Sequence, residues 1–77
     1  MNKDDFAEKA LKILEENESG YAANLHHARK AARALGMEGD YDEFCEKLLN
    51  DINSSSENKM INRGQLDFVL HKLGKEL

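Results

Sequence analysis

Apolar residues recur every three or four positions along most of the chain, and breaks in this pattern divide it into four segments. The breaks fall at Gly20, at 36–40 (GMEGD) and at 53–62 (NSSSENKMIN). A spacing of three to four residues places apolar side chains on one face of a helix, and period-two alternation of strand length is missing from the sequence. The pattern therefore predicts an all-α fold, a compact four-helix domain with helices at about 4–17, 21–35, 41–53 and 63–75.

Each predicted helix carries an apolar stripe that would face a common core. In the first helix the stripe comprises Phe6, Ala7, Ala10, Ile13 and Leu14, and in the second it comprises Leu25, Ala28, Ala32 and Leu35. The alanines of the second helix favour helix formation and let a neighbouring helix come close. Gly36 follows this helix at the position where glycine commonly ends a helix. In the third helix the stripe comprises Tyr41, Phe44, Cys45, Leu48, Leu49 and Ile52, with Asp42, Glu43, Glu46 and Asn53 opposite. In the fourth it comprises Leu66, Val69, Leu70 and Leu73.

Capping signals mark the starts of the last two helices. Asp40 and Glu43 have the D-x-x-E spacing of a capping box, in which two side chains satisfy backbone N–H groups of the first turn. Asn62 and Gln65 stand at the same N-cap and N3 spacing. These pairs predict that the third helix begins at about 41 and the fourth at about 63.

Composition limits the class of protein. The 77 residues, 40% hydrophobic and 34% charged, suffice for a single helical domain over 1–77 and are too apolar for a disordered chain. No apolar run approaches the roughly 20 residues of a membrane span, and Met1 leads into polar NKDDF rather than into a secretory signal. The single cysteine, Cys45, excludes an internal disulfide and fits a reducing compartment. We therefore expect a cytoplasmic protein that has no membrane partner.

Charge is segregated along the chain, whose net charge is −4. Residues 21–37 hold three basic and no acidic residues, whereas residues 38–57 hold one basic and seven acidic residues. At about 100° per residue, the basic side chains of the second helix form one strip beside its apolar stripe: His26, Arg29, Lys30 and Arg33. Two interpretations stay open. The strip is a solvated face or forms salt bridges with the acidic third helix, or it docks an acidic protein surface or a phosphate, each of which the planar guanidinium of arginine binds through two hydrogen bonds.

A second candidate surface lies on the fourth predicted helix. Phe68 points away from the apolar stripe of that helix and is flanked by His71, Lys72 and Lys75. A large aromatic ring in this position either packs against another part of the chain, such as 53–62 or the N-terminus, or contacts a partner. In the second case Phe68 and Lys72 would contact an acidic protein or a second copy of the chain in a homodimer.

The sequence offers no catalytic, metal or cofactor site. Adjacent His26 and His27 point about 100° apart on a helix and do not readily share one ion. Cys45 belongs to an apolar stripe, and a Cys45–His71 pair lacks an orienting third group. The paired carboxylates stand at solvent-facing helix positions, and the sequence contains no glycine-rich phosphate loop. We therefore expect a protein that is not an enzyme and takes no cofactor.

The stretches ESGYAANLHHARKAARALG and LLNDINSSSENKMINRGQLDFVLHKLG resemble the two halves of an EF-hand pair. With Ile61 at position 8 of the second loop, the calcium-ligand positions hold Ser54, Ser56, Asn58 and Gln65, and Lys59 replaces the usual glycine. The acidic residue that binds calcium through both oxygens is therefore missing. The resemblance implies a calcium-free pair of hands that forms a helical cup for a partner segment.

These features predict a small non-enzymatic protein-binding module, an adaptor, regulator or inhibitor that contacts an acidic surface of another protein. Small acidic helical proteins of this kind are often encoded by phages or plasmids. The expected partner-binding residues are His26, Arg29, Lys30, Arg33, Phe68 and Lys72. One alternative is a nucleic-acid-binding regulator that uses the basic second helix, although the net charge argues against it. The other is an acidic mimic of nucleic-acid phosphates, formed by Asp42, Glu43 and Glu46.

Overall fold

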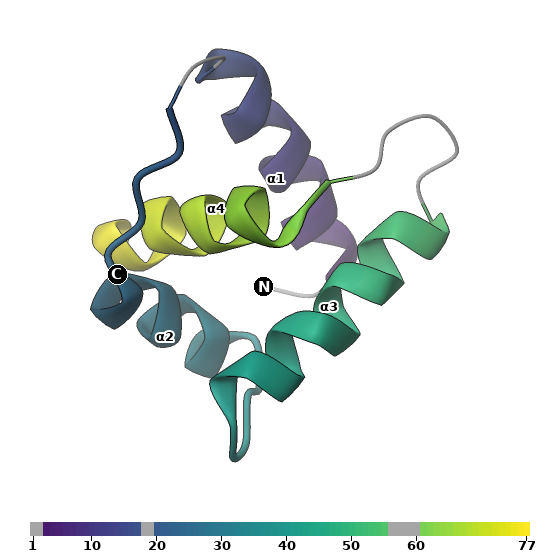
Figure 1. Ribbon diagram of the computed structural model, residues 1–77, viewed down its shortest axis with the longest axis vertical. Helices are drawn as coiled ribbons and strands as arrows, with labels where there is room; N and C mark the ends of the chain where they lie inside the picture. The colour runs from purple at the N-terminus through teal and green to yellow at the C-terminus, as the bar shows by residue number, and fades with distance from the viewer. Residues whose placement is uncertain (1–2, 18–19, 56–60) are drawn as a thin grey trace.

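The computed structural model describes residues 3–17, 20–55 and 61–77, along which four helices follow one another (Figure 1). The helices are α1 (Lys3–Glu16), α2 (Leu25–Ala34), α3 (Tyr41–Ser55) and α4 (Arg63–Glu76). These ranges contain no strand, and none of their helices is long and apolar enough to cross a membrane. The predicted all-α four-helix domain is confirmed, and the predicted bounds of α1, α3 and α4 are within two residues of those observed.

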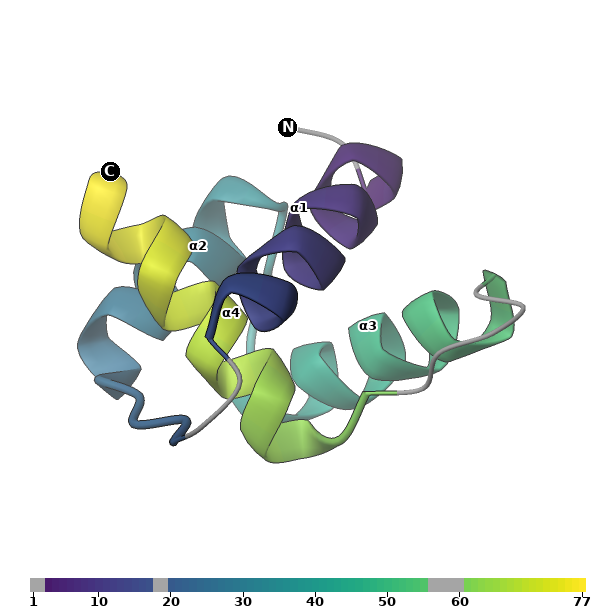
Figure 2. The same cartoon turned by 90° about the horizontal axis from the view of Figure 1, so that it is seen from above.

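Helix α4 is the central element of the fold. It contacts each of the other three helices and packs most extensively against α2. In Figures 1 and 2, α4 runs through the middle of the molecule, with α1 and α2 on different sides of it. Its residues Leu66, Val69 and Leu70 are completely buried. The core cluster around them draws on the predicted stripes of the other helices and includes Phe6, Ala10, Ala28, Ala32, Cys45 and Leu48.

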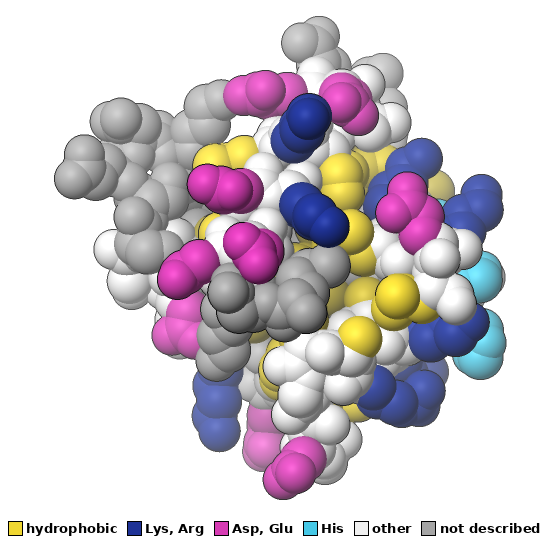
Figure 3. All heavy atoms as spheres, turned by 180° about the vertical axis from the view of Figure 1, so that it is seen from behind, with side chains coloured by type: hydrophobic (Ala, Val, Ile, Leu, Met, Phe, Trp, Pro, Cys, Tyr) yellow, Lys and Arg dark blue, Asp and Glu magenta, His cyan; other side chains and the backbone are white. Residues whose placement is uncertain are grey.

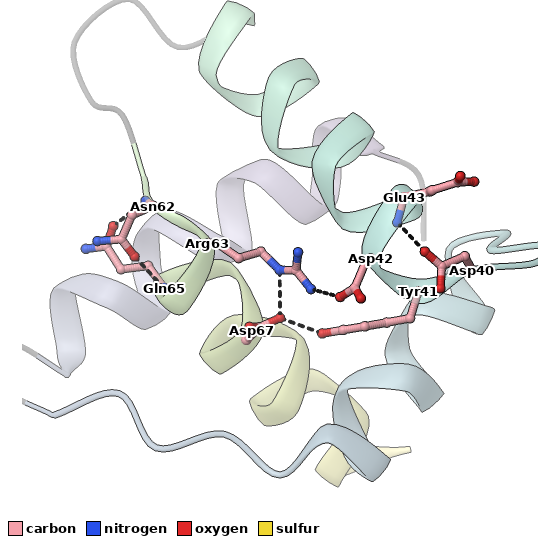
Figure 4. A network of polar contacts seen from close by, with 8 residues as sticks. All are labelled: Asp40, Tyr41, Asp42, Glu43, Asn62, Arg63, Gln65 and Asp67. Carbon is pink, nitrogen blue, oxygen red and sulfur yellow. Dashed lines mark hydrogen bonds and ion pairs between the residues drawn. The ribbon is translucent and has the colours of Figure 1, made fainter.

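The starts of α3 and α4 are fixed by the predicted caps. The Asn62 side chain accepts a hydrogen bond from the Gln65 backbone N–H, and the Gln65 side chain accepts one from the Asn62 backbone N–H, each at 2.8 Å. At α3, Asp40 Oδ2 accepts from the Glu43 backbone N–H at 3.1 Å (Figure 4). Both helices begin directly after the residue that caps them, as the sequence predicts.

Helix α2 begins at Leu25, four residues later than predicted. Asn24 caps it, because the Asn24 side chain accepts from the His26 backbone N–H at 2.9 Å. The Asn24 backbone N–H donates to Nδ1 of His71 on α4 at 3.2 Å, and the Tyr21 ring meets the Phe68 ring edge-on with 5.3 Å between centroids. These contacts with α4 keep residues 21–24 out of the helix despite their alanines.

Two predicted positions relative to the core are wrong. Leu25, which was expected in the core, is 44% exposed, because it is the first residue of α2 and lies at the rim of the packed region. Asn53, which was expected on the solvent side, is half-buried and forms a double hydrogen bond with Ile61. Its Oδ1 accepts from the Ile61 N–H at 3.0 Å, and its Nδ2 donates to the Ile61 carbonyl at 3.2 Å. Asn53 thereby ties the end of α3 to the start of the α4 region.

The EF-hand resemblance stays a prediction. Three of the positions on which it depends, Ser56, Asn58 and Lys59, lie outside the described residues.

Candidate functional site

The four residues of the predicted basic strip are all exposed on α2: His26, Arg29, Lys30 and Arg33. In the part of the chain that the structure describes, the strip forms no ion pair with an acidic side chain. Instead, the Arg29 guanidinium lies 5.7 Å from the centroid of the Tyr41 ring. Salt bridges between the strip and the third helix are therefore wrong for these residues, whereas a solvated face and a docking surface both stay predictions. Asp42 of α3 pairs instead with Arg63 of α4, with 2.7 Å between Asp42 Oδ1 and Arg63 Nη2.

The contact between α2 and α4 brings the second predicted surface beside the strip. The rings of His27 and His71 are 5.5 Å apart, and His71 also binds Asn24. Figure 3 shows His, Lys and Arg side chains gathered along one side of the molecule. We call this surface the cationic face. Its members on α2 are the four strip residues, and its members on α4 are His71, Lys72 and Lys75.

Phe68 does not contribute an exposed ring to this face. Its side chain is 6% exposed, because Tyr21 packs against it and the Lys72 ammonium lies 5.7 Å from its ring centroid. Of the two interpretations of Phe68, packing against another part of the chain is therefore confirmed, and contact with a partner through an exposed ring is wrong. The covering residue, Tyr21, lies in the non-helical segment before α2, where helical periodicity gives no signal for its contacts.

A groove with a volume of about 570 Å³ lies beside the strip, between α2 and the starts of α3 and α4. Arg29 and Arg33 line it from α2, so that half of the strip faces the groove. Its charged lining comprises Arg29, Arg33, Arg63, Asp40, Asp42 and Asp67.

A polar network on α3 and α4 forms part of the groove (Figure 4). The Tyr41 hydroxyl donates to Asp67 Oδ1 at 2.7 Å, and Arg63 Nε donates to the same oxygen at 3.2 Å. Arg63 Nη2 donates to Asp42 Oδ1 at 2.7 Å. Burial and the bond to Asp67 raise the pKa of Tyr41 above its ordinary value, so the phenol stays protonated and acts as the donor. The positive charge of Arg63 is thus balanced by two carboxylates of its own chain, Asp42 and Asp67.

Sequence reasoning missed this network because its partners are distant in the chain. The signal for Tyr41 was its place in the apolar stripe of α3, which predicts burial of the ring and says nothing of its hydroxyl. Arg63 and Asp67 stand one turn apart on α4, a spacing that predicts only a weak surface pair. Their common contact with Tyr41 depends on how α3 meets α4.

Two reactive side chains of the described residues, Cys45 and His27, are wholly or partly buried. Burial raises the pKa of the Cys45 thiol, and this side chain is fully buried. The His27 Nδ1 atom is buried without a hydrogen-bond partner, and the His27 ring lies 5.7 Å from that of His26. Among the described residues, no three His, Cys, Asp or Glu side chains are grouped so that they could hold a metal ion.

Comparisons with protein-family models, curated proteins and solved structures found no match to this chain.

Proposed function

We propose that the protein is a small cytoplasmic protein-binding module, an adaptor, regulator or inhibitor without chemistry of its own. In this proposal it docks an acidic surface of another protein on its cationic face. One observation carries the proposal. Arg29, Lys30 and Arg33 are exposed and form no ion pair within the described residues, although the chain as a whole has a net charge of −4.

The arrangement of the arginines supports an acidic partner. Arg29 and Arg33 stand one helical turn apart, which brings their side chains to the same side of α2. A planar guanidinium binds a carboxylate through two parallel hydrogen bonds, so the pair can hold two carboxylates of a partner. Opposite charge on the two surfaces also raises the rate of association and excludes basic partners.

Affinity capture with a charge-matched control tests the proposal. Arg29→Glu combined with Arg33→Glu should abolish retention of the proteins that the native chain captures from cells that produce it. Lys9→Glu combined with Lys12→Glu changes the net charge equally, on exposed positions of α1, and should leave retention unchanged. Circular dichroism establishes that both variants are folded. Equal retention by both variants would refute docking on the strip.

Nucleic-acid binding is a second candidate function, because the Lys and Arg side chains of the cationic face can also bind phosphates. A gel shift with short DNA and RNA duplexes decides it, because phosphate contacts weaken steeply when salt rises from about 50 mM to about 200 mM. The absence of a shift at the lower salt concentration removes this candidate. The phosphate-mimic alternative is less well supported, since Arg63 places a positive charge beside Asp42 and a series of phosphates has no such charge.

A further inference from the structure

We infer that the groove beside the strip recognises a protein segment that carries an acidic and a basic side chain close together. The acidic side chain would meet Arg29 and Arg33, and the basic one would meet Asp40 and Asp42. This inference rests on the proposed function and specifies the partner segment that the site would select.

The charges of the groove are separated between its walls. Arg29 and Arg33 line it from α2, whereas Asp40 and Asp42 line it from the start of α3. The third arginine, Arg63, binds Asp42 and Asp67 and is therefore already compensated. The α2 wall thus presents cations that have no acidic partner among the described residues, and the α3 wall presents carboxylates.

The carboxylates on the α3 wall remain accessible to a partner. The Asp42 side chain is 75% exposed, and its bond to Arg63 uses only Oδ1. Asp40 is also exposed, and its bond to the Glu43 N–H uses only Oδ2. A nucleic-acid strand or a purely acidic peptide that reached Arg29 and Arg33 would be repelled by these carboxylates. A segment with both signs of charge would satisfy both walls, because complementary potentials across an interface determine which partner is accepted.

The α2 wall is held in place by the fold. The Arg29 guanidinium rests near the face of Tyr41, whose ring is buried and whose hydroxyl is bound to Asp67. An arginine that is already placed by a ring loses less side-chain freedom on binding than a free one. Tyr41 and Asp67 are thus positioning residues for Arg29.

Nuclear magnetic resonance titration of the full chain, labelled with ¹⁵N, tests the inference with three probes. The probes are a short peptide of alternating Glu and Lys, an all-Glu peptide of equal length and a single-stranded DNA oligonucleotide. The mixed peptide should shift the side-chain Nε–H signals of Arg29 and Arg33 together with the backbone N–H signals of Asp40 and Asp42. It should also bind more tightly than the other two probes.

Two variants isolate the contribution of the α3 wall. Asp42→Asn should weaken binding of the mixed peptide by about two- to fivefold, the range of one exposed ion pair, without weakening binding of the all-Glu peptide. Glu46→Gln, an equal charge change at an exposed position on the same helix, should leave both affinities unchanged. Thermal unfolding of each variant establishes that it is folded.

Several outcomes overturn the inference. In the first, the mixed peptide at millimolar concentration shifts no signal of the groove residues. In the second, DNA or the all-Glu peptide binds as tightly as the mixed peptide or more tightly. In the third, Asp42→Asn prefers the mixed peptide over the all-Glu peptide as strongly as the native protein does. Groove shifts that grow on concentrating the protein alone would identify a second copy of the chain as the occupant.

The failure of this inference can be told from the failure of the proposed function. If the peptide tests fail but Arg29→Glu with Arg33→Glu still abolishes partner capture, the proposed function stands without the mixed-charge segment. If the peptide binds as expected but capture is unaffected, the proposed function fails.

Discussion

Gly74 of α4 lies directly against the backbone carbonyl group of His27 on α2, so that a Cβ atom at position 74 would overlap that group. Gly74 is buried, and the absence of a side chain there lets the two helices approach closely. On α2, Ala28, Ala31 and Ala32 are buried in the core cluster, and α2 packs more extensively against α4 than against α3. The same approach brings His71 beside Asn24, and it therefore assembles the cationic face.

Gly74→Ala should destabilise the protein by about 1–3 kcal/mol. Alanine in a helix interior is normally favoured over glycine by about 0.5–1 kcal/mol, but here the added methyl group meets backbone that cannot rotate away. Overpacking of this kind typically costs about 1–3 kcal/mol and forces neighbouring elements apart. The free energy of unfolding in urea, measured with circular dichroism, gives the change.

Gly64→Ala is the matched control on the same helix. A Cβ at position 64 would have Asn62 Oδ1 as its nearest neighbour, at 3.4 Å, an ordinary contact. This variant should be neutral or more stable by up to about 1 kcal/mol. Equal effects of alanine at 64 and 74 would contradict the close approach of α2 to α4.

Helical periodicity and capping predicted most of the fold because both are local properties. The buried residues of α3, such as Leu48 and Ile52, follow from the spacing of apolar positions, and the reciprocal Asn62–Gln65 cap follows from two residues three apart. The start of α2 could not be predicted in this way. It is set by contacts of Tyr21 and Asn24 with α4, which join positions 47 residues apart in the chain.

Tyr41→Phe should destabilise the protein by about 1–2 kcal/mol. The variant keeps the buried ring but removes the donor to Asp67, leaving that carboxylate with fewer hydrogen bonds. Hydrogen bonds to charged groups contribute about 1.5–3 kcal/mol, and Arg63 continues to bind Asp67, which moderates the loss. Thermal and urea unfolding measure the loss of stability.

Tyr21→Phe is the control and should be nearly neutral, because no hydrogen bond of the Tyr21 hydroxyl is present among the described residues. A neutral Tyr41→Phe would show that the bond contributes nothing to stability.

The candidate site was predictable only in part. The strip through His26, Arg29, Lys30 and Arg33 could be found because charge position on a helix follows from spacing alone. The groove depends on where α2 lies relative to Tyr41 and Asp42, and no local pattern contains that information. The surroundings of Phe68 likewise depend on a contact that no local pattern contains. Its position on α4 left open whether the ring packs within the chain or contacts a partner, and the residue that covers it, Tyr21, stands 47 positions earlier in the chain.

Asn53→Ala should destabilise the protein by about 1–3 kcal/mol. It removes both hydrogen bonds to the backbone of Ile61 and leaves a partly buried N–H and carbonyl without their side-chain partner. Asn50→Ala, an exposed position on the same helix, supplies the control and should change stability by no more than about 0.5 kcal/mol. Native-state hydrogen exchange provides a local measurement, because the Ile61 amide should lose protection in Asn53→Ala and keep it in Asn50→Ala. Retained protection in both variants would show that the side chain of Asn53 does not hold this amide.

Stability should fall in mild acid because of His71. Burial, His27, Lys75 and Lys72 lower the pKa of His71 below its ordinary value of 6.5. Its Nδ1 atom also accepts the Asn24 N–H, which a proton on that atom would prevent. A group whose pKa is lower in the folded state contributes stability that is complete above its unfolded pKa. That stability is lost as the pH falls through the unfolded and then the folded value. The melting temperature should therefore drop between about pH 8 and about pH 5.

His71→Asn separates this effect from general acid denaturation. The asparagine oxygen can accept from the Asn24 N–H at any pH, so the variant should lose less melting temperature in acid than the native protein does. His26→Asn removes an exposed histidine from the same face and should keep the native pH dependence. A direct titration of the His71 ring signals should give a midpoint below that of free histidine, and the backbone signal of Asn24 should move with it. Parallel pH profiles for the native protein and His71→Asn would contradict the assignment, because the proton taken up on unfolding would then belong to another group.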